Sequence, residues 1–283
     1  MRSVKSLVVA GAAALLSSSA FAADLTVPPP MYPPPPAAYG GWYLRGDIGM
    51  SNQHVKNLVF TQPGAYNNEV VSETSSFSSA GIFDLGVGYQ FNNWFRADVT
   101  AQYRGKSDFT GLDMVSGTGP FAGFYNNDNY TATKSELLFL ANAYADLGTW
   151  WCITPFVGAG VGMARVTISN FTDLGVNNNH GTYFGGPPVV ADASAGSASE
   201  WNFAWALHAG LAYQVTPDVT LELAYSFVDL GDGVTGPVNS FDHATYVNAP
   251  PFKFHNITSN DLTLGMRWNF DNPPPPPPLI TKG

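Results

Sequence analysis

Charged side chains recur at every second position of several segments whose other positions are apolar. In residues 94–104, Arg96, Asp98 and Arg104 alternate with an apolar set that runs from Phe95 to Tyr103. Successive side chains of a β-strand point to opposite faces, so these charges share one polar face. The same pattern places five basic and seven acidic residues on such faces: Arg45, Asp47, Asp84, Arg96, Asp98, Arg104, Lys134, Glu136, Asp146, Glu222, Asp261 and Arg267.

The elements that must position these charges are eight segments with alternating apolar and polar residues. Residues 261–270 show the pattern most clearly, because Leu262, Leu264, Met266, Trp268 and Phe270 alternate with polar residues or glycine. An apolar face and a polar face on every strand predict an all-β fold, an eight-stranded antiparallel up-and-down transmembrane β-barrel. The expected strands are residues 42–51, 81–91, 94–104, 133–147, 153–168, 201–214, 219–227 and 261–270.

Inside such a barrel the charged set has two possible roles. Opposite charges can pair and fill the interior, as buried charges require. An unfilled interior would instead form a narrow pore with a weak preference for cations, since the acids outnumber the bases. Eight strands leave little open space, so we expect a polar network and keep the pore as a further hypothesis.

A nucleophilic site is a minor alternative. Ser226 and Glu222 share one face of residues 219–227, and His208 faces inward on the preceding segment. A lipid hydrolase needs a serine beside a histidine that an acid orients. Because no serine lies two residues from His208, the pairing would depend on two strands lying side by side, and we expect no enzyme.

The sequence also lacks the spacings of metal and nucleotide sites. His54, His180, His243 and His255 fall in predicted loops without metal-ligand spacing. The alternate glycines at positions 158, 160 and 162 are not followed by a helix that could hold a phosphate. We therefore expect no metal and no cofactor, and we expect those glycines on the inner face of a narrow barrel.

Residues 1–22 have the features of an export signal. Arg2 and Lys5 precede a short apolar run, and Ala20-Phe21-Ala22 is a small-residue cleavage site, so cleavage is expected after Ala22. Without Arg2 and Lys5 the 12 basic residues fall to 10 against 21 acidic ones, which disfavours nucleic acid as a partner. Pro-rich stretches at 23–40 and 271–283 flank the predicted barrel domain at 41–270; they are spacers or docking segments for a periplasmic partner.

The connections alternate between short turns and long polar segments. Residues 52–80, 105–132, 169–200 and 228–258 are long and rich in Gly and Asn, and they include aromatics such as Phe124 and Tyr130. Short turns on one side and long loops on the other are typical of outer-membrane barrels. We expect loops whose tips could bind a host or phage ligand. Arg165, on the apolar face near the outer end of its strand, suits the phosphate of lipopolysaccharide.

Three stretches resemble the small outer-membrane β-barrel proteins of alphaproteobacteria, the opacity-protein and surface-antigen-like porin family. They are residues 41–49 (GWYLRGDIG), 154–162 (TPFVGAGVG) and 267–270 (RWNF). The resemblance implies an abundant surface antigen of the Gram-negative envelope that the barrel-assembly machinery inserts. It also implies that Trp268 and Phe270 belong to an aromatic girdle and an assembly signal, although here a tail follows Phe270.

Together these features predict a structural integral protein of the bacterial outer membrane, in contact with membrane lipid and lipopolysaccharide. The alternative from another class is an adhesin, a surface module that binds host or phage through its long loops.

Overall fold

The computed structural model describes residues 40–60, 69–119, 122–179, 184–242, 245–249 and 251–270. The predicted signal peptide, nearly all of the Pro-rich segment at 23–40, and the tail at 271–283 lie outside the described residues, as do His180 and His243. Within the described part of the chain, no helix is long and apolar enough to span a membrane.

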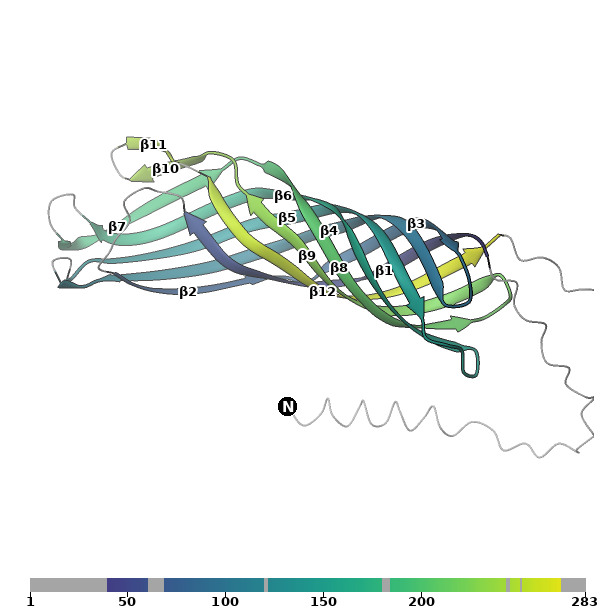
Figure 1. Ribbon diagram of the computed structural model, residues 1–283. Coiled ribbons are helices and arrows are strands. Elements are labelled where there is room, and N and C mark those ends of the chain that lie inside the picture. Colours follow the sequence, from purple (N-terminus) through teal and green to yellow (C-terminus); the bar gives the residue numbers. More distant parts are fainter. Residues whose placement is uncertain are drawn as a thin grey trace, which may run out of the picture. The chain divides into compact units, whose positions relative to one another are not determined.

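Eight antiparallel strands close into a ring (Figure 1). Each pairs with the next, and the last pairs with the first, so the predicted fold class is confirmed. In ring order the strands are β1 (Gly41–Phe60), β3 (Ala80–Gln90), β4 (Phe95–Gly117), β5 (Tyr125–Asp146), β6 (Ile153–Asn179), β8 (Ala198–Gln214), β9 (Val219–Val234) and β12 (Phe252–Asn269).

The register of the ring gives the tilt of its strands. Paired residues lead once around the barrel from Trp42 through Tyr89, Ala97, Ala143, Ala159, Leu207, Phe227 and Asn260 to Asn52. The circuit returns to β1 ten residues beyond its start (42 to 52). A stagger of this kind forces the strands to tilt, by roughly 35–45° in closed barrels.

An apolar belt surrounds the part of the barrel nearest the short turns. It consists of the outward-facing large residues that the alternation predicted, among them Leu44, Phe83, Val161, Leu223 and Met266, each at least a third exposed to the surroundings. The short turns connect neighbouring strands at this end of the barrel. In one of them the Asn92 side chain accepts hydrogen bonds from the backbone N–H groups of Trp94 and Phe95, at 3.0 and 2.8 Å.

The alternate glycines of β6 face the interior and make room for large neighbours on β5. A Cβ at Gly158 would lie 2.4 Å from Cδ1 of Tyr144, and one at Gly160 would lie 2.0 Å from Oδ1 of Asn142. The glycines therefore let β5 direct full-sized polar side chains into a narrow bore.

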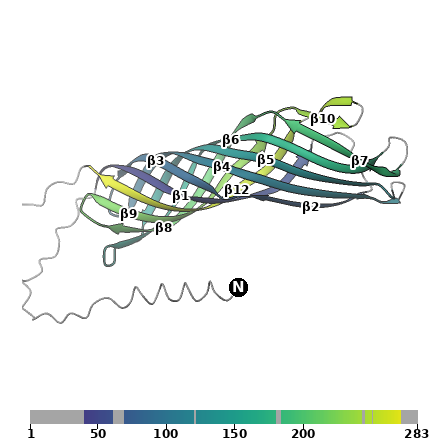
Figure 2. The ribbon, with the colours of Figure 1, turned by 180° about the vertical axis from the view of Figure 1, so that it is seen from behind.

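The structure differs from the sequence prediction in the four long segments. They are largely strands, because the barrel strands continue past the apolar belt and four further strands join them. Three of these, β2, β7 and β10, are labelled at one end of the sheet in Figure 2. We call this part of the sheet the extension. Its added strands are β2 (Glu69–Phe77), which pairs with β4; β7 (Phe184–Ala195), which pairs with β6; and β10 (Val238–Asp242), which pairs with β7 and with β11 (Thr245–Ala249).

Apolar packing explains why those segments are ordered as strands. Phe109, Tyr130, Phe171, Phe252 and Phe254 all point inward and are buried. Their rings lie against one another, with centroids 4.9 Å apart for Phe109 and Phe254 and 4.7 Å for Phe171 and Phe252. Phe124 and Tyr130, expected at loop tips, are likewise buried.

Candidate functional site

The interior near the short turns holds a dense ionic network. Arg45 donates to Asp47 at 2.9 Å, to Asp98 at 3.0 Å and to the Tyr144 hydroxyl at 2.9 Å. Four strands, β1, β4, β5 and β9, contribute to this network, because the Glu222 carboxylate lies 3.7 Å from the same guanidinium. The guanidinium is therefore held by acceptors on several sides.

Glu222 lies where three arginines converge. Its carboxylate oxygens are 3.3 Å from Arg96, 3.5 Å from Arg267 and 3.7 Å from Arg45. Arg96 also contacts Asp146 at 3.2 Å and lies over the Tyr144 ring, with its guanidinium carbon 4.2 Å from the centroid. The buried carboxylate of Glu222 therefore balances part of the positive charge of three arginines.

A second ionic group lies farther from the short turns. Arg104 donates to Asp261 and, at 3.1 Å, to Ser259. Lys134 contacts both Glu136 and Gln53. Gln53 lies in a segment that the sequence assigned to a loop, and Ser259 lies just before the predicted strand at 261–270, so alternation alone did not indicate them.

The structure places all twelve predicted lumen residues in the interior, where each side chain is at most 9% exposed. Eleven of them take part in ion pairs with one another. The twelfth, Asp84, accepts a hydrogen bond from Gln102 at 3.4 Å.

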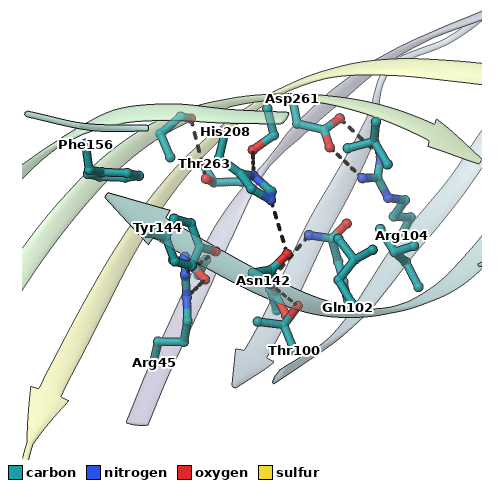
Figure 3. Close-up of a pocket in the computed structure, with 17 residues that line it drawn as sticks. Arg45, Thr100, Gln102, Arg104, Asn142, Tyr144, Phe156, His208, Asp261 and Thr263 are labelled. Atoms are coloured by element: carbon teal, nitrogen blue, oxygen red, sulfur yellow. Dashed lines mark hydrogen bonds and ion pairs between the residues drawn. The ribbon is translucent and has the colours of Figure 1, made fainter. Parts of the chain in front are cut away.

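A small cavity remains between the two ionic groups (Figure 3). Its volume is about 30 Å³, enough for roughly two water molecules. His208 lines it, with Nδ1 2.8 Å from the Ser226 hydroxyl and Nε2 3.2 Å from Oδ1 of Asn142. Strands β8 and β9 do bring His208 and Ser226 together, but the group facing the other ring nitrogen is Asn142, and Glu222 is held by the three arginines. The pair also faces the interior of the barrel, where the cavity has no room for a lipid.

On the side of the cavity away from the short turns, apolar side chains close the interior. Leu138, Val166, Ile168, Leu230 and Ile257 are at most 1% exposed and pack with the aromatic rings of the extension in one cluster. We call this cluster the apolar cap. Leu138 and Leu140, which interrupted the polar alternation of β5, face inward as part of the cap. Beyond them the cap and the second ionic group share the interior, since Glu136 pairs across the strands with Val166 and Lys134 with Ile168.

The outer face of the extension carries regular rows of exposed side chains. Paired positions on five adjacent strands form a hydroxyl row: Ser76, Thr110, Thr131, Thr172 and Ser194. Within it the Ser76 and Thr110 hydroxyls are 3.1 Å apart, and those of Thr131 and Thr172 are 2.7 Å apart. The next two rows combine amides and one carboxylate with exposed or half-buried apolar side chains: Met114, Asn127, Val176 and Val190 in one, and Leu112, Asn129, Leu174 and Asp192 in the other. We call these three rows the outer face.

Three carboxylates gather on the opposite, inner face of the extension. Asp113 pairs across the strands with Asp128 and accepts a hydrogen bond from the Tyr130 hydroxyl at 3.3 Å. Burial, together with the neighbouring carboxylates, raises the pKa of Asp128 to about 6 and that of Asp173 to about 8. Among the residues that the structure describes, no group of His, Cys, Asp and Glu has the arrangement of a metal site.

The structure places the remaining predicted residues on the surface. Arg165 is exposed on β6, and its guanidinium donates to the Ser199 hydroxyl at 3.3 Å; its contact with lipopolysaccharide stays a prediction. Trp268 and Phe270 are about half exposed, with ring centroids 5.3 Å apart, in the apolar belt at the short-turn end. Their role in assembly likewise stays a prediction.

Comparison with known proteins gives a family. The family model described as "Outer membrane protein beta-barrel domain" matches residues 8–270. An uncharacterized protein of Brucella abortus is 27% identical over 82% of this chain and 86% of its own length. The outer membrane protein PagN of Salmonella typhimurium is 28% identical over 81% of this chain and 90% of its own, and a candidate adhesin of Rickettsia felis is 28% identical over 81% and 87%.

Similar solved structures are also outer-membrane proteins. Neisserial surface protein A matches with a TM-score of 0.42 and 15% identity over 81% of this chain and 97% of its own. OprG of Pseudomonas aeruginosa matches with a TM-score of 0.40 and 14% identity over 83% and 97%. The family match covers most of the chain, including every strand of the ring. The chain therefore belongs to the outer-membrane protein β-barrel domain family and is a protein of the bacterial outer membrane.

Proposed function

We propose that this protein is a closed structural barrel that anchors a binding surface outside the cell. In this family the short turns lie on the periplasmic side and the long connections on the extracellular side. The extension is therefore extracellular, and the outer face is presented to other cells or to phage. This proposal joins the two functions that the sequence predicted, an integral structural protein and an adhesin.

The observation that carries the proposal is that the ordered, exposed chemistry lies outside the barrel and not within it. Ion pairs and the apolar cap occupy the interior and leave a cavity of about 30 Å³. A hydrated ion cannot cross an apolar cluster whose core side chains are at most 1% exposed. The outer face, in contrast, offers hydroxyls, amides and apolar side chains in register.

Two relatives add support. The proteins of Rickettsia felis and Rickettsia canadensis that are named as candidate adhesins cover most of this chain at 28% and 27% identity. We infer a function of the same kind, in which the outer face contacts an uncharged or weakly charged region of a host or phage surface molecule. Exposed Leu174, 58% accessible, and Val190, 56% accessible, would supply the apolar contacts of such an interface.

Adherence of bacteria that carry outer-face variants tests the proposal. Leu174→Asp and Asn129→Asp place new charges on two paired positions of the outer face, and we expect each to reduce adherence. Asn52→Asp is the matched control, because Asn52 is an exposed asparagine on β1, away from the outer face. Surface protease sensitivity and the shift in gel mobility on boiling confirm equal folded amounts. Equal adherence of all three variants and the unmodified protein would show that the outer face binds nothing.

Planar-bilayer recordings test the other half of the proposal. The closed interior leads us to expect no steady conductance from the purified protein. A reproducible channel, removed by a variant of the lumen network such as Asp98→Asn, would restore the cation-preferring pore and contradict a closed anchor.

A further inference from the structure

An open groove of about 450 Å³ lies on the outside of the barrel, within the apolar belt. It runs across β1, β3, β4 and β5. Small residues, Gly46 and Ala101, form its floor, and its walls are the exposed side chains of Ile48, Phe83, Tyr103 and Phe139.

The register explains the hollow. One row of paired residues alternates small and large: Gly46, Leu85, Ala101 and Phe139. The next row toward the extracellular side is large throughout: Ile48, Phe83, Tyr103 and Leu137. Gly46 is not required by the backbone, because a Cβ there would approach no atom closer than 3.4 Å. The backbone does not depend on this glycine, and a single larger side chain would fill the hollow in the outer surface.

A cation lies just beyond the extracellular end of the groove. Lys106 is on β4, three residues after Tyr103, and a register shift between Arg104 and Ser107 directs it outward. The chain at this bulge lies against β3, since a Cβ at Gly105 would be 3.5 Å from the carbonyl oxygen of Gly81. Lys106 is exposed, so its ammonium can meet a ligand from the membrane.

The distribution of the other basic residues shows which leaflet is involved. Among the described residues, the basic side chains outside the barrel interior are Lys56, Lys106, Arg165 and Lys253. Each lies on the extracellular side of the last belt residue of its strand. Exposed cations on that side alone complement the phosphates of the outer leaflet.

We propose that this groove binds an acyl chain of lipid A, the phosphorylated glycolipid anchor of lipopolysaccharide, and that Lys106 binds its phosphate. An acyl chain gains no hydrophobic free energy by moving from bilayer to groove, because both are apolar. Its retention must come from close packing against the walls and from a contact made by the head group. A groove that ends beneath an exposed ammonium provides both contacts, and it does so independently of any ligand of the outer face.

Binding of diphosphoryl lipid A to the purified full chain in detergent, followed by native mass spectrometry, tests the proposal. Lys106→Gln removes the cation, and the loss of one interfacial charge should weaken binding about fivefold. Ala101→Leu fills the groove and should weaken binding of both diphosphoryl and dephosphorylated lipid A. The Lys106→Gln variant should bind the dephosphorylated lipid as the unmodified protein does.

Two controls match these variants. Ala209→Leu enlarges an exposed belt alanine on β8, outside the groove, and Lys253→Gln removes an exposed cation from β12; neither should reduce binding as much as its counterpart. Arg165→Gln, two strands from Lys106, is measured in the same titration and tests the contact predicted from the sequence. Equal binding by the groove variants and their controls would overturn the proposal. A change in the monomer–dimer equilibrium of Ala101→Leu with unchanged lipid binding would also overturn it, since the groove would then be a contact between copies.

Discussion

The barrel interior is filled in two different ways along its length. The half nearest the short turns contains Arg45, Arg96 and Arg267 around Glu222, whereas the half toward the extension contains the apolar cap beside the second ionic group. Ion pairs hold the side chains of a narrow interior in a fixed arrangement, but removing one partner leaves the other as an uncompensated buried charge. Apolar packing tolerates the loss of one member better, and it blocks ions more completely. The difference indicates that the cap closes the interior to ions and that the ionic network sets the geometry of the barrel.

The largest expected effect comes from breaking the ionic half. Glu222→Gln removes the one carboxylate that faces all three arginines, so their charges stay buried with less compensation. We expect a loss of about 3–5 kcal/mol in the free energy of unfolding, measured by urea titration of the folded barrel in lipid vesicles. Asp84→Asn is the control, because Asp84 takes part in none of the ion pairs between described residues and accepts a hydrogen bond from Gln102 instead. Equal losses for both variants would argue against a special role for the three-arginine cluster.

Truncation in the apolar cap should cost somewhat less. Leu230 is fully buried, and Leu230→Ala should lower the free energy of unfolding by about 3 kcal/mol through the lost contacts and the cavity. Leu174→Ala, on the exposed outer face, should change it by less than about 0.5 kcal/mol. If the Leu230 variant also conducts ions while Glu222→Gln does not, the cap is the seal, as the comparison of the two halves requires.

The inner face of the extension predicts a dependence on pH. Asp128 and Asp173 have ordinary pKa values of 3.8 that rise to about 6 and about 8 on folding. The folded state therefore holds more protons, and stability decreases as pH rises through these values. Hydrogen exchange of β5 and β6 beyond the belt, corrected for intrinsic rates, should show more protection at pH 5 than at pH 8. In the double variant Asp128→Asn, Asp173→Asn this difference should disappear; an unchanged difference would assign it to other groups.

The smallest expected effect concerns the cavity between the two halves. Ser226→Ala removes the hydrogen bond to His208 and should cost about 1 kcal/mol. Lipid turnover by membranes containing the protein should not change, because the pair faces the closed interior. A loss of turnover with this variant would instead identify a hydrolase.

Alternation with a period of two predicted the eight strands of the ring and the faces of their charges. It failed beyond the belt, because the Gly, Asn, Asp and Ser content of residues 105–132 and 169–200 favours loops in any local reading. Only distant contacts, such as that of Phe109 with Phe254, make strands of those residues. A register shift such as that between Arg104 and Ser107 also reverses which face each later residue occupies, and no local pattern shows it. Gln53, one of the partners of Lys134, and the outer face were therefore not predictable, although Glu136, Arg104 and Asp261 were.

The unbroken strands of the extension fix how far the protein reaches from the membrane. β6 has 27 residues, which at about 3.3 Å each is roughly 90 Å of strand, and only part of it crosses an apolar layer about 25 Å thick. A ligand would meet a rigid platform held clear of the lipid head groups, instead of loops that must first become ordered. The entropic cost of ordering this surface is already included in the free energy of folding. A ligand that binds to the surface would therefore not add that cost to the binding free energy.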